Sequence, residues 1–168
     1  MTVYATIDSP LGALLLVGVE SATARGGTAL ASLSVPGQKG GATVQDGWLE
    51  KTEAFDEIVA QLTSYFDGRL TRFDIEYVTG GSEFQRRVWQ ALEAIPYGTT
   101  LSYGDIAARI GAPRAAVRAV GTAIGANPLL VVRPCHRVIG ASGALTGYAG
   151  GLERKRRLLD LENAHRDV

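Results

Sequence analysis

The sequence predicts an α+β protein with two domains, a small sheet-plus-helix domain over residues 1–80 and a mostly helical domain over residues 81–168. Three observations support this prediction. Short apolar segments separated by turn signals fill most of the first half, an apolar pattern with helical period follows them, and helix starts dominate the second half. The 168 residues can form one large domain or two small ones, and a hydrophobic content of 46% is enough to bury a core.

The first predicted elements are a β-hairpin and a third strand. Residues 4–8 and 14–19 flank Ser9-Pro10-Leu11-Gly12, a sequence typical of a tight turn between strands. Residues 29–35 are the third strand. From Thr52 the period changes, and apolar residues three or four positions apart form one face of a helix: Phe55, Ile58, Val59, Leu62, Tyr65 and Phe66.

Asp67-Gly68 ends this helix, and residues 73–78 are predicted to return to the sheet as a short strand. Thr79-Gly80-Gly81 is the predicted domain boundary. The first domain contains no combination of residues that indicates catalysis, so we expect it to support the second.

The second domain begins with a helix whose start is marked by a capping box of Ser82 and Gln85 and whose end is marked by Pro96-Tyr97-Gly98. Its buried face carries Phe84, Val88, Trp89 and Leu92. The last helix begins near Leu152. Its leucines at positions 158, 159 and 161 are expected to point inward, and its Lys and Arg residues outward.

Between these helices, two shorter ones predict a helix-turn-helix. Ser102 with Asp105 begins the first, residues 111–113 make the turn, and the second covers residues 114–124. The second helix is poor in long side chains except for Arg118. Such a helix either packs tightly on a neighbour or approaches a DNA groove, where the arginine can enter the base stack.

The charge is distributed unevenly although the formal net charge is zero. Residues 1–80 hold 5 Lys and Arg against 10 Asp and Glu, whereas residues 81–168 hold 12 against 7. Eleven of those twelve cations are arginine, whose planar fork suits phosphates and base edges. On charge alone, a solvated basic face and a nucleic-acid-binding face remain equal alternatives.

Cys135 is the only cysteine and lies in the run Arg133-Pro134-Cys135-His136-Arg137. An adjacent histidine, flanking arginines and a rigid proline favour the thiolate, which is the nucleophilic form. The alternative is an inert buried cysteine. One thiol excludes a disulfide framework, and with two histidines it does not complete a structural zinc site, so no metal is expected.

A reactive free thiol fits a reducing compartment, so we expect a cytoplasmic protein. The first residues lack a basic segment followed by a long apolar one, and no apolar run approaches about 18 residues. We therefore expect neither a secretory signal nor a membrane span.

The segment from Ser82 to Glu162 resembles the C-terminal domain of the O6-alkylguanine-DNA alkyltransferases, also called methylated-DNA–protein-cysteine methyltransferases. The stretches that carry the resemblance are Phe84-Gln85-Arg86-Arg87-Val88-Trp89, Pro96-Tyr97-Gly98 with Ser102-Tyr103-Gly104, Arg118-Ala119-Val120-Gly121 with Asn127-Pro128, Pro134-Cys135-His136-Arg137-Val138, and Gly147-Tyr148-Ala149-Gly150-Gly151-Leu152. The first half is similar to the family only through residues 8–12 and its layout. The resemblance implies an RNase-H-like fold for residues 1–80 and a winged-helix-like helix-turn-helix domain for residues 81–168.

The resemblance also implies direct-reversal DNA repair. An alkyl group, typically methyl, would pass from O6 of guanine in double-stranded DNA to Cys135, after the nucleotide flips out through the minor groove. His136 would act as the base through a bound water, and Glu162 would orient its ring. Tyr103 would supply a proton or hydrogen bond to the departing guanine. The thioether is stable, so we expect one irreversible turnover per molecule, no cofactor, and a monomer.

Further roles are implied residue by residue. Asn127 would tie the recognition helix to the active-site turn, and Arg118 would fill the gap left by the flipped nucleotide. The backbone carbonyls of Cys135 and Val138 would accept from the exocyclic amine of guanine. Other contacts with DNA or the alkyl group are expected at Pro134, Ala119, Gly121, Tyr148 and Ala149. Many relatives have serine where this chain has Ala149, so that contact would use the backbone.

Other classes share parts of this pattern. A cysteine hydrolase would use the same thiol, histidine and acid, but it turns over and needs an oxyanion hole that the sequence does not locate. Alkyltransferase-like proteins bind lesions without repairing them, but they lack the cysteine. A regulator of the adaptive-response type carries an additional metal–thiolate domain, for which one cysteine is too few. The sequence leaves open the size of the alkyl group and any cooperativity on DNA.

Overall fold

The computed structural model describes residues 1–163 of the chain. Its residue contacts divide the protein into two compact units, Met1–Thr79 and Gly80–Val168. No helix of the described residues is long and apolar enough to cross a membrane.

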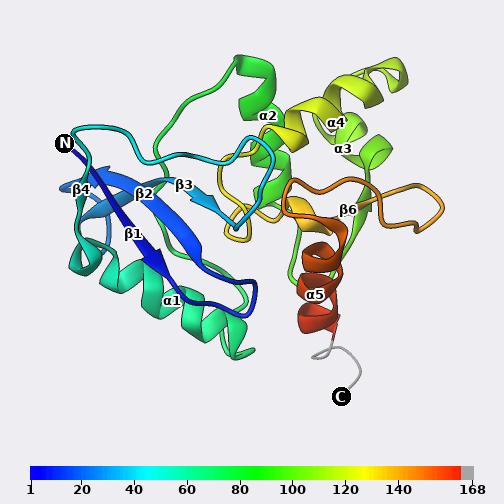
Figure 1. Cartoon of the computed structure of the whole chain (residues 1–168). Coiled ribbons are helices and arrows are strands. Elements are labelled where there is room, and N and C mark those ends of the chain that lie inside the picture. Colours follow the sequence, from blue (N-terminus) through cyan, green and yellow to red (C-terminus); the bar gives the residue numbers. More distant parts are fainter. Residues whose placement is uncertain (164–168) are drawn as a thin grey trace. The chain divides into compact units, whose positions relative to one another are not determined.

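The first unit is built on a four-stranded sheet (Figure 1). Strands β1 (Thr2–Ile7), β2 (Leu14–Glu20) and β3 (Thr28–Ser34) are antiparallel neighbours, and the short β4 (Leu49–Glu50) runs parallel to β1. The hairpin and the third strand predicted from the sequence are confirmed. The strand order is β3-β2-β1-β4.

One helix lies along this sheet (Figure 1). The 3-10 turn η1 (Thr52–Phe55) leads into α1 (Asp56–Phe66), as the apolar period predicted. Their buried side chains are Phe55, Ile58, Leu62 and Tyr65.

The strand predicted over residues 73–78 is wrong. This segment forms only one isolated bridge, between Tyr77 and Leu30 of β3. The backbone at Asp74 is bonded elsewhere, because the Gln61 side chain of α1 donates to its carbonyl and accepts from its N–H. Since a ladder needs those same backbone groups, the extended segment cannot pair along its length.

The second unit is mostly helical, and its core joins the first helix to the helix-turn-helix. Trp89 donates through its indole nitrogen to the carbonyl of Ala123 at 2.9 Å, while Val88, Leu92 and Val120 are fully buried.

The elements of the second unit are α2 (Glu83–Glu93), β5 (Leu101–Ser102), α3 (Tyr103–Arg109), η2 (Arg114–Ala116), α4 (Val117–Gly125), η3 (Cys135–Arg137), β6 (Val138–Ile139) and α5 (Leu152–Asn163). Strands β5 and β6 pair in parallel.

Two predicted helix starts are confirmed in detail. Ser82 and Gln85 form a reciprocal capping box at α2, and Ser102 and Asp105 form another at α3. The second helix of the pair starts with a 3-10 turn after Pro113, so the regular helix α4 begins three residues later than predicted.

Helix α5 departs from the prediction at one position. Leu158 and Leu159 are buried and Leu161 is half-buried, but Lys155, expected to point outward, is 0% exposed. Its ammonium group donates to the carbonyls of Thr146 at 2.6 Å and Gly147 at 3.2 Å. These bonds compensate for the lost hydration of the ammonium group.

Candidate active site

The backbone that leads to the thiol is strained and tightly turned. Val131 has φ 70°, a value that β-branched residues rarely adopt and that costs about 1–3 kcal/mol. Pro134 has φ −77° and ψ 61°, which makes an inverse γ-turn in which Cys135 N–H donates to the Arg133 carbonyl at 2.7 Å. Such a conformation persists only where surrounding contacts enforce it.

Asn127 supplies those contacts, and this residue is 2% exposed. Its amide oxygen accepts from Leu129 N–H at 3.0 Å and from Arg133 Nη1 at 3.2 Å. Its amide nitrogen donates to the carbonyls of Leu129 and Arg133, both at 3.2 Å. One buried amide therefore cross-links the end of α4 to the turn before Cys135.

A buried carboxylate joins the two residues that follow Cys135. Glu162 of α5 is 1% exposed, and its Oε2 lies 2.7 Å from His136 Nε2. Arg137 binds the same carboxylate with two nitrogens, at 2.8 Å and 3.0 Å, and donates to the Ile95 carbonyl at 2.6 Å. Burial alone would raise the pKa of Glu162, but the hydrogen bond from His136, and after it the hydrogen bonds and charge of the Arg137 guanidinium, lower it well below its usual range.

This pairing determines which nitrogen of His136 carries the proton. An ionised carboxylate can only accept, so Nε2 must be the donor. Burial lowers the pKa of His136, which keeps the ring neutral. Nδ1 has no hydrogen-bond partner in the described part of the chain. The ring next to Cys135 thus presents a lone pair that can accept a proton.

The thiol itself is protonated at rest, contrary to the prediction that its neighbours favour the thiolate. Cys135 is 4% exposed, and burial raises its pKa to about 11. A hydrogen bond from Asn127 and the charges of Lys155 and Arg133 oppose this shift without cancelling it. The prediction failed because burial of the thiol outweighs these favourable effects, and because the flanking arginines are paired with carboxylates, Glu93 for Arg133 and Glu162 for Arg137.

The loop before α5 is tied to two other parts of the unit. The Tyr103 hydroxyl donates to the Thr146 carbonyl at 3.4 Å and accepts from its Oγ1 at 3.2 Å. Lys155 binds the same carbonyl, and burial lowers the pKa of this lysine to about 8. The hydroxyl of Tyr148 is buried, and burial together with the nearby Cys135 raises its pKa well above its usual value.

Helix α4 places the residues expected to meet DNA on its surface. Arg118 and Ala119 are exposed, and Gly121 is half-buried. A Cβ on Gly121 would lie 3.9 Å from the ring of Tyr103, so α4 and the phenol are neighbours. The other exposed residues of α4 are Thr122 and Gly125, which are both small.

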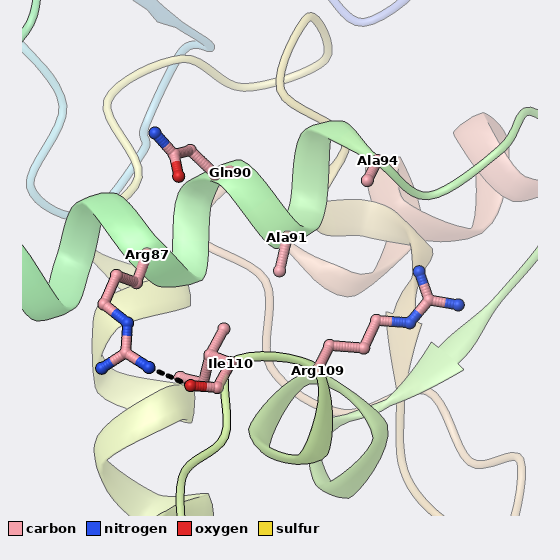
Figure 2. A pocket seen from close by; sticks show the side chains of 6 residues that line it. All are labelled: Arg87, Gln90, Ala91, Ala94, Arg109 and Ile110. Carbon is pink, nitrogen blue, oxygen red and sulfur yellow. Dashed lines mark hydrogen bonds between the residues drawn. The ribbon is translucent and has the colours of Figure 1, made fainter.

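Two surface grooves flank the helix-turn-helix, and Cys135 lines neither. One of about 590 Å³ runs along α3 and η2 and includes Tyr103 and Arg114. Figure 2 shows the other, of about 510 Å³, between α2 and the end of α3, where Arg87 donates to the Ile110 carbonyl. The groove beside Tyr103 therefore exposes the phenol, whereas the sulfur stays covered.

The remaining residues predicted for the site gather around the same turn. Pro134 and Val138 are buried on either side of η3, and Ala149 is half-buried in the loop after Tyr148. Sequence reasoning missed the structural parts of Arg137, Arg133 and Lys155, which it counted only as cations. The number of cations in the second half of the chain suggested a charged face, and nothing in their spacing indicated that these three are buried.

Comparisons with known proteins give consistent matches along the chain. The family described as 6-O-methylguanine DNA methyltransferase, DNA binding domain, matches residues 83–164, and its ribonuclease-like domain matches residues 2–78. Methylated-DNA–protein-cysteine methyltransferases of Mycolicibacterium paratuberculosis and Methanosarcina acetivorans are 54% and 47% identical, over 98% and 96% of this chain and 94% and 98% of theirs. A crystal structure of Mycobacterium tuberculosis OGT in complex with DNA is similar with a TM-score of 0.86 and 51% identity, over 96% of this chain and 93% of that one.

We expect Glu162→Gln to lower the free energy of unfolding by about 3–5 kcal/mol near pH 7, because it leaves the buried Arg137 guanidinium without a counter-charge. The pKa of Glu162 is depressed in the folded state, so its contribution is present above about pH 4.3 and disappears as the pH falls below that value. Urea unfolding of both proteins at several pH values should show a difference that shrinks in acid. Asp160→Asn, an exposed carboxylate of the same helix, is the control. A difference that stays constant down to pH 3 would contradict the assignment.

The raised pKa of Cys135 predicts slow alkylation at neutral pH. With a pKa of about 11, the rate of reaction with iodoacetamide should still rise above pH 10. The urea-denatured chain provides the control, because its single thiol should level off at a pH set by the usual pKa of about 8.5. A plateau below pH 9 in the folded protein would show that the thiolate is already formed.

Proposed function

This chain belongs to the methylated-DNA–protein-cysteine methyltransferase family, and we propose that Cys135 is the residue that accepts the methyl group from O6 of guanine. The protein acts on DNA in direct-reversal repair. The observation that carries the assignment is the neutral His136 ring beside the only thiol of the chain. Its Nε2–H donates to Glu162, and its Nδ1 has no hydrogen-bond partner among the described residues.

The proposed reaction is an in-line displacement at carbon. The proton of the Cys135 thiol passes to His136 Nδ1, through a water as the family resemblance implies, while the sulfur forms a bond to the alkyl carbon. The carbon–oxygen bond breaks, and its electron pair remains on the guanine. Tyr103 donates a hydrogen bond to the guanine ring as this charge develops. The imidazolium formed in this step is stabilised by Glu162 at 2.7 Å.

Proton transfer belongs to the reaction and not to the resting state. Burial raises the pKa of Cys135 and lowers that of His136, so both groups stay neutral until the sulfur begins to bond to the alkyl carbon. The resulting thioether has no second thiol to release it. Each molecule therefore acts once, and DNA supplies the alkyl group without a cofactor.

Recognition of DNA is proposed for the exposed face of α4. Small residues such as Ala119 and Gly121 let the helix backbone approach the minor groove, and Arg118 enters the stack where the nucleotide has left it. Flipping a nucleotide costs a few kcal/mol, and less for a weakly paired damaged base.

The turn at Cys135 and the loop that carries Tyr148 and Ala149 are proposed to select guanine and the alkyl group. The Cys135 carbonyl already accepts from Val138 N–H, and its second lone pair can accept from the exocyclic amine. The Val138 carbonyl is the second acceptor. Pro134, Tyr148 and the backbone of Ala149 line the alkyl side. A neutral thiol of this kind is kept reduced in the cytoplasm, where we place the protein.

One titration tests the acceptor and the single turnover together. Incubating excess O6-methylguanine duplex with the protein should add one methyl per chain, located on the Cys135 peptide by mass spectrometry. The Cys135→Ser variant should add none and leave the lesion in the DNA. More than one lesion cleared per chain, or a native thiol after repair, would refute the proposal.

The role of Arg118 predicts a difference between two substrates. Arg118→Ala should slow repair of a duplex by at least about tenfold, because the emptied stack is no longer filled, and should leave the reaction with free O6-benzylguanine nearly unchanged. Arg118→Lys keeps the charge without the planar fork and separates stacking from phosphate attraction. Equal losses on both substrates would rule out insertion.

A further inference from the structure

Arg133 is a buried cation, and the proposed reaction assigns no role to it. It is 7% exposed although it lies two residues before the thiol. Its Nε donates to Glu93 Oε2 at 3.0 Å, and its guanidinium carbon lies 4.9 Å from the centre of the Trp89 ring. Its Nη1 donates to the amide oxygen of Asn127 at 3.2 Å. The side chain therefore links α2 to the asparagine that holds the active-site turn.

Helix α2 provides a rigid base for this link. Trp89 and Glu93 are four residues apart on α2, so they share one face of the helix. Trp89 is also bonded to the Ala123 carbonyl of α4 at 2.9 Å. A guanidinium held by a carboxylate and an aromatic ring on the same helix has little freedom to move, which suits it to orient another group.

The group that it orients is the Asn127 amide. An amide can turn over by half a rotation, which exchanges its oxygen and its nitrogen. In the turned orientation the NH₂ group would face the guanidinium of Arg133 and the Leu129 N–H, which are both donors. The oxygen would then face the carbonyls of Leu129 and Arg133, which are both acceptors. Arg133 and the Leu129 N–H therefore admit only the orientation that directs the NH₂ group toward the turn.

We propose that Arg133 is a positioning residue for the alkyl transfer, which holds the Asn127 amide in the one orientation that supports the Cys135 turn and is itself held by Glu93 and Trp89. The proposal rests on the proposed role of Cys135 as the alkyl acceptor. In this role Arg133 acts on the turn and not on the reacting atoms. It acts through Asn127.

The electrostatics of the thiol agree with this geometry. Against the effect of burial, the hydrogen bond from Asn127 and the charge of Arg133 both lower the pKa of Cys135. The other titratable groups that act on or adjoin the sulfur are Lys155 from α5, Tyr148 from the loop and the neighbouring His136. Loss of Arg133 should therefore shift the pH dependence of Cys135 alkylation to higher pH, whereas a purely structural support would change only stability.

The test measures two quantities besides the half-saturating DNA concentration. These are the single-turnover rate of methyl transfer from an O6-methylguanine duplex to Cys135 at pH 7.5, and the rate of Cys135 alkylation by iodoacetamide between pH 8 and pH 11. Arg133→Met should lower the methyl-transfer rate by about tenfold and move the pH dependence of alkylation to higher pH, with the half-saturating concentration changed less than about twofold. Arg133→Lys, which keeps the charge but lacks the second donor direction, should recover part of the rate. Arg69→Met, a variant of an exposed arginine paired with Asp67, is the matched control and should react as the wild type does.

A double-mutant cycle identifies the path of the effect. In an Asn127→Ala background, Arg133→Met should cause no further loss of rate, because the amide that it orients is absent. Should Arg133→Met fail to fold, Glu93→Gln serves in its place, since it loosens the anchor and should lower the rate in the same direction by about threefold.

Several results would overturn the proposal. These are a wild-type rate and pH profile for both Arg133→Met and Glu93→Gln, a lower melting temperature with an unchanged rate, or an equal loss of rate with and without Asn127. A wild-type chain that gains no methyl on Cys135 would instead overturn the proposed function, and this proposal with it.

Discussion

The buried carboxylate of Glu162 is the constraint on which the reactive end of the second unit depends. It accepts from His136 on one side and from two nitrogens of Arg137 on the other, so both residues after Cys135 are fixed by one group. A carboxylate that is 1% exposed is tolerated only with such compensation. Because the acid comes from α5 and its partners from η3, the docked last helix is what holds the proton of the histidine on Nε2.

The second constraint is the strained turn between α4 and the thiol. The unfavourable φ of Val131 and the γ-turn at Pro134 are compensated by the four hydrogen bonds of Asn127. The same packing buries Cys135 and raises its pKa. A neutral thiol reacts slowly with oxidants, which suits the proposed role of Cys135 as a nucleophile that is used once. The fold thus preserves the sulfur and leaves its activation to the moment of reaction.

The sequence predicted an element correctly where the signal lies within a few neighbouring residues. Both capping boxes, the hairpin turn and the face of α1 depend on residues three or four positions apart, and the structure contains all of them. The predictions failed where a distant group intervened. Gln61 takes the backbone groups that the segment around Asp74 would need as a strand, and the carbonyls before α5 draw Lys155 inward.

The sequence by itself determined the two-domain α+β organisation and the helix-turn-helix, because these follow from hydrophobic period and helix-start signals. It also singled out Cys135 and His136, which we propose as the nucleophile and its base, through their adjacency and the family resemblance. Only the tertiary structure decided the protonation of the site. Whether the arginines beside Cys135 lower its pKa depends on the groups they face, and both are paired with carboxylates far away in the chain, on α2 and α5. The ordinary state of the thiol is set by its burial, which no local pattern encodes.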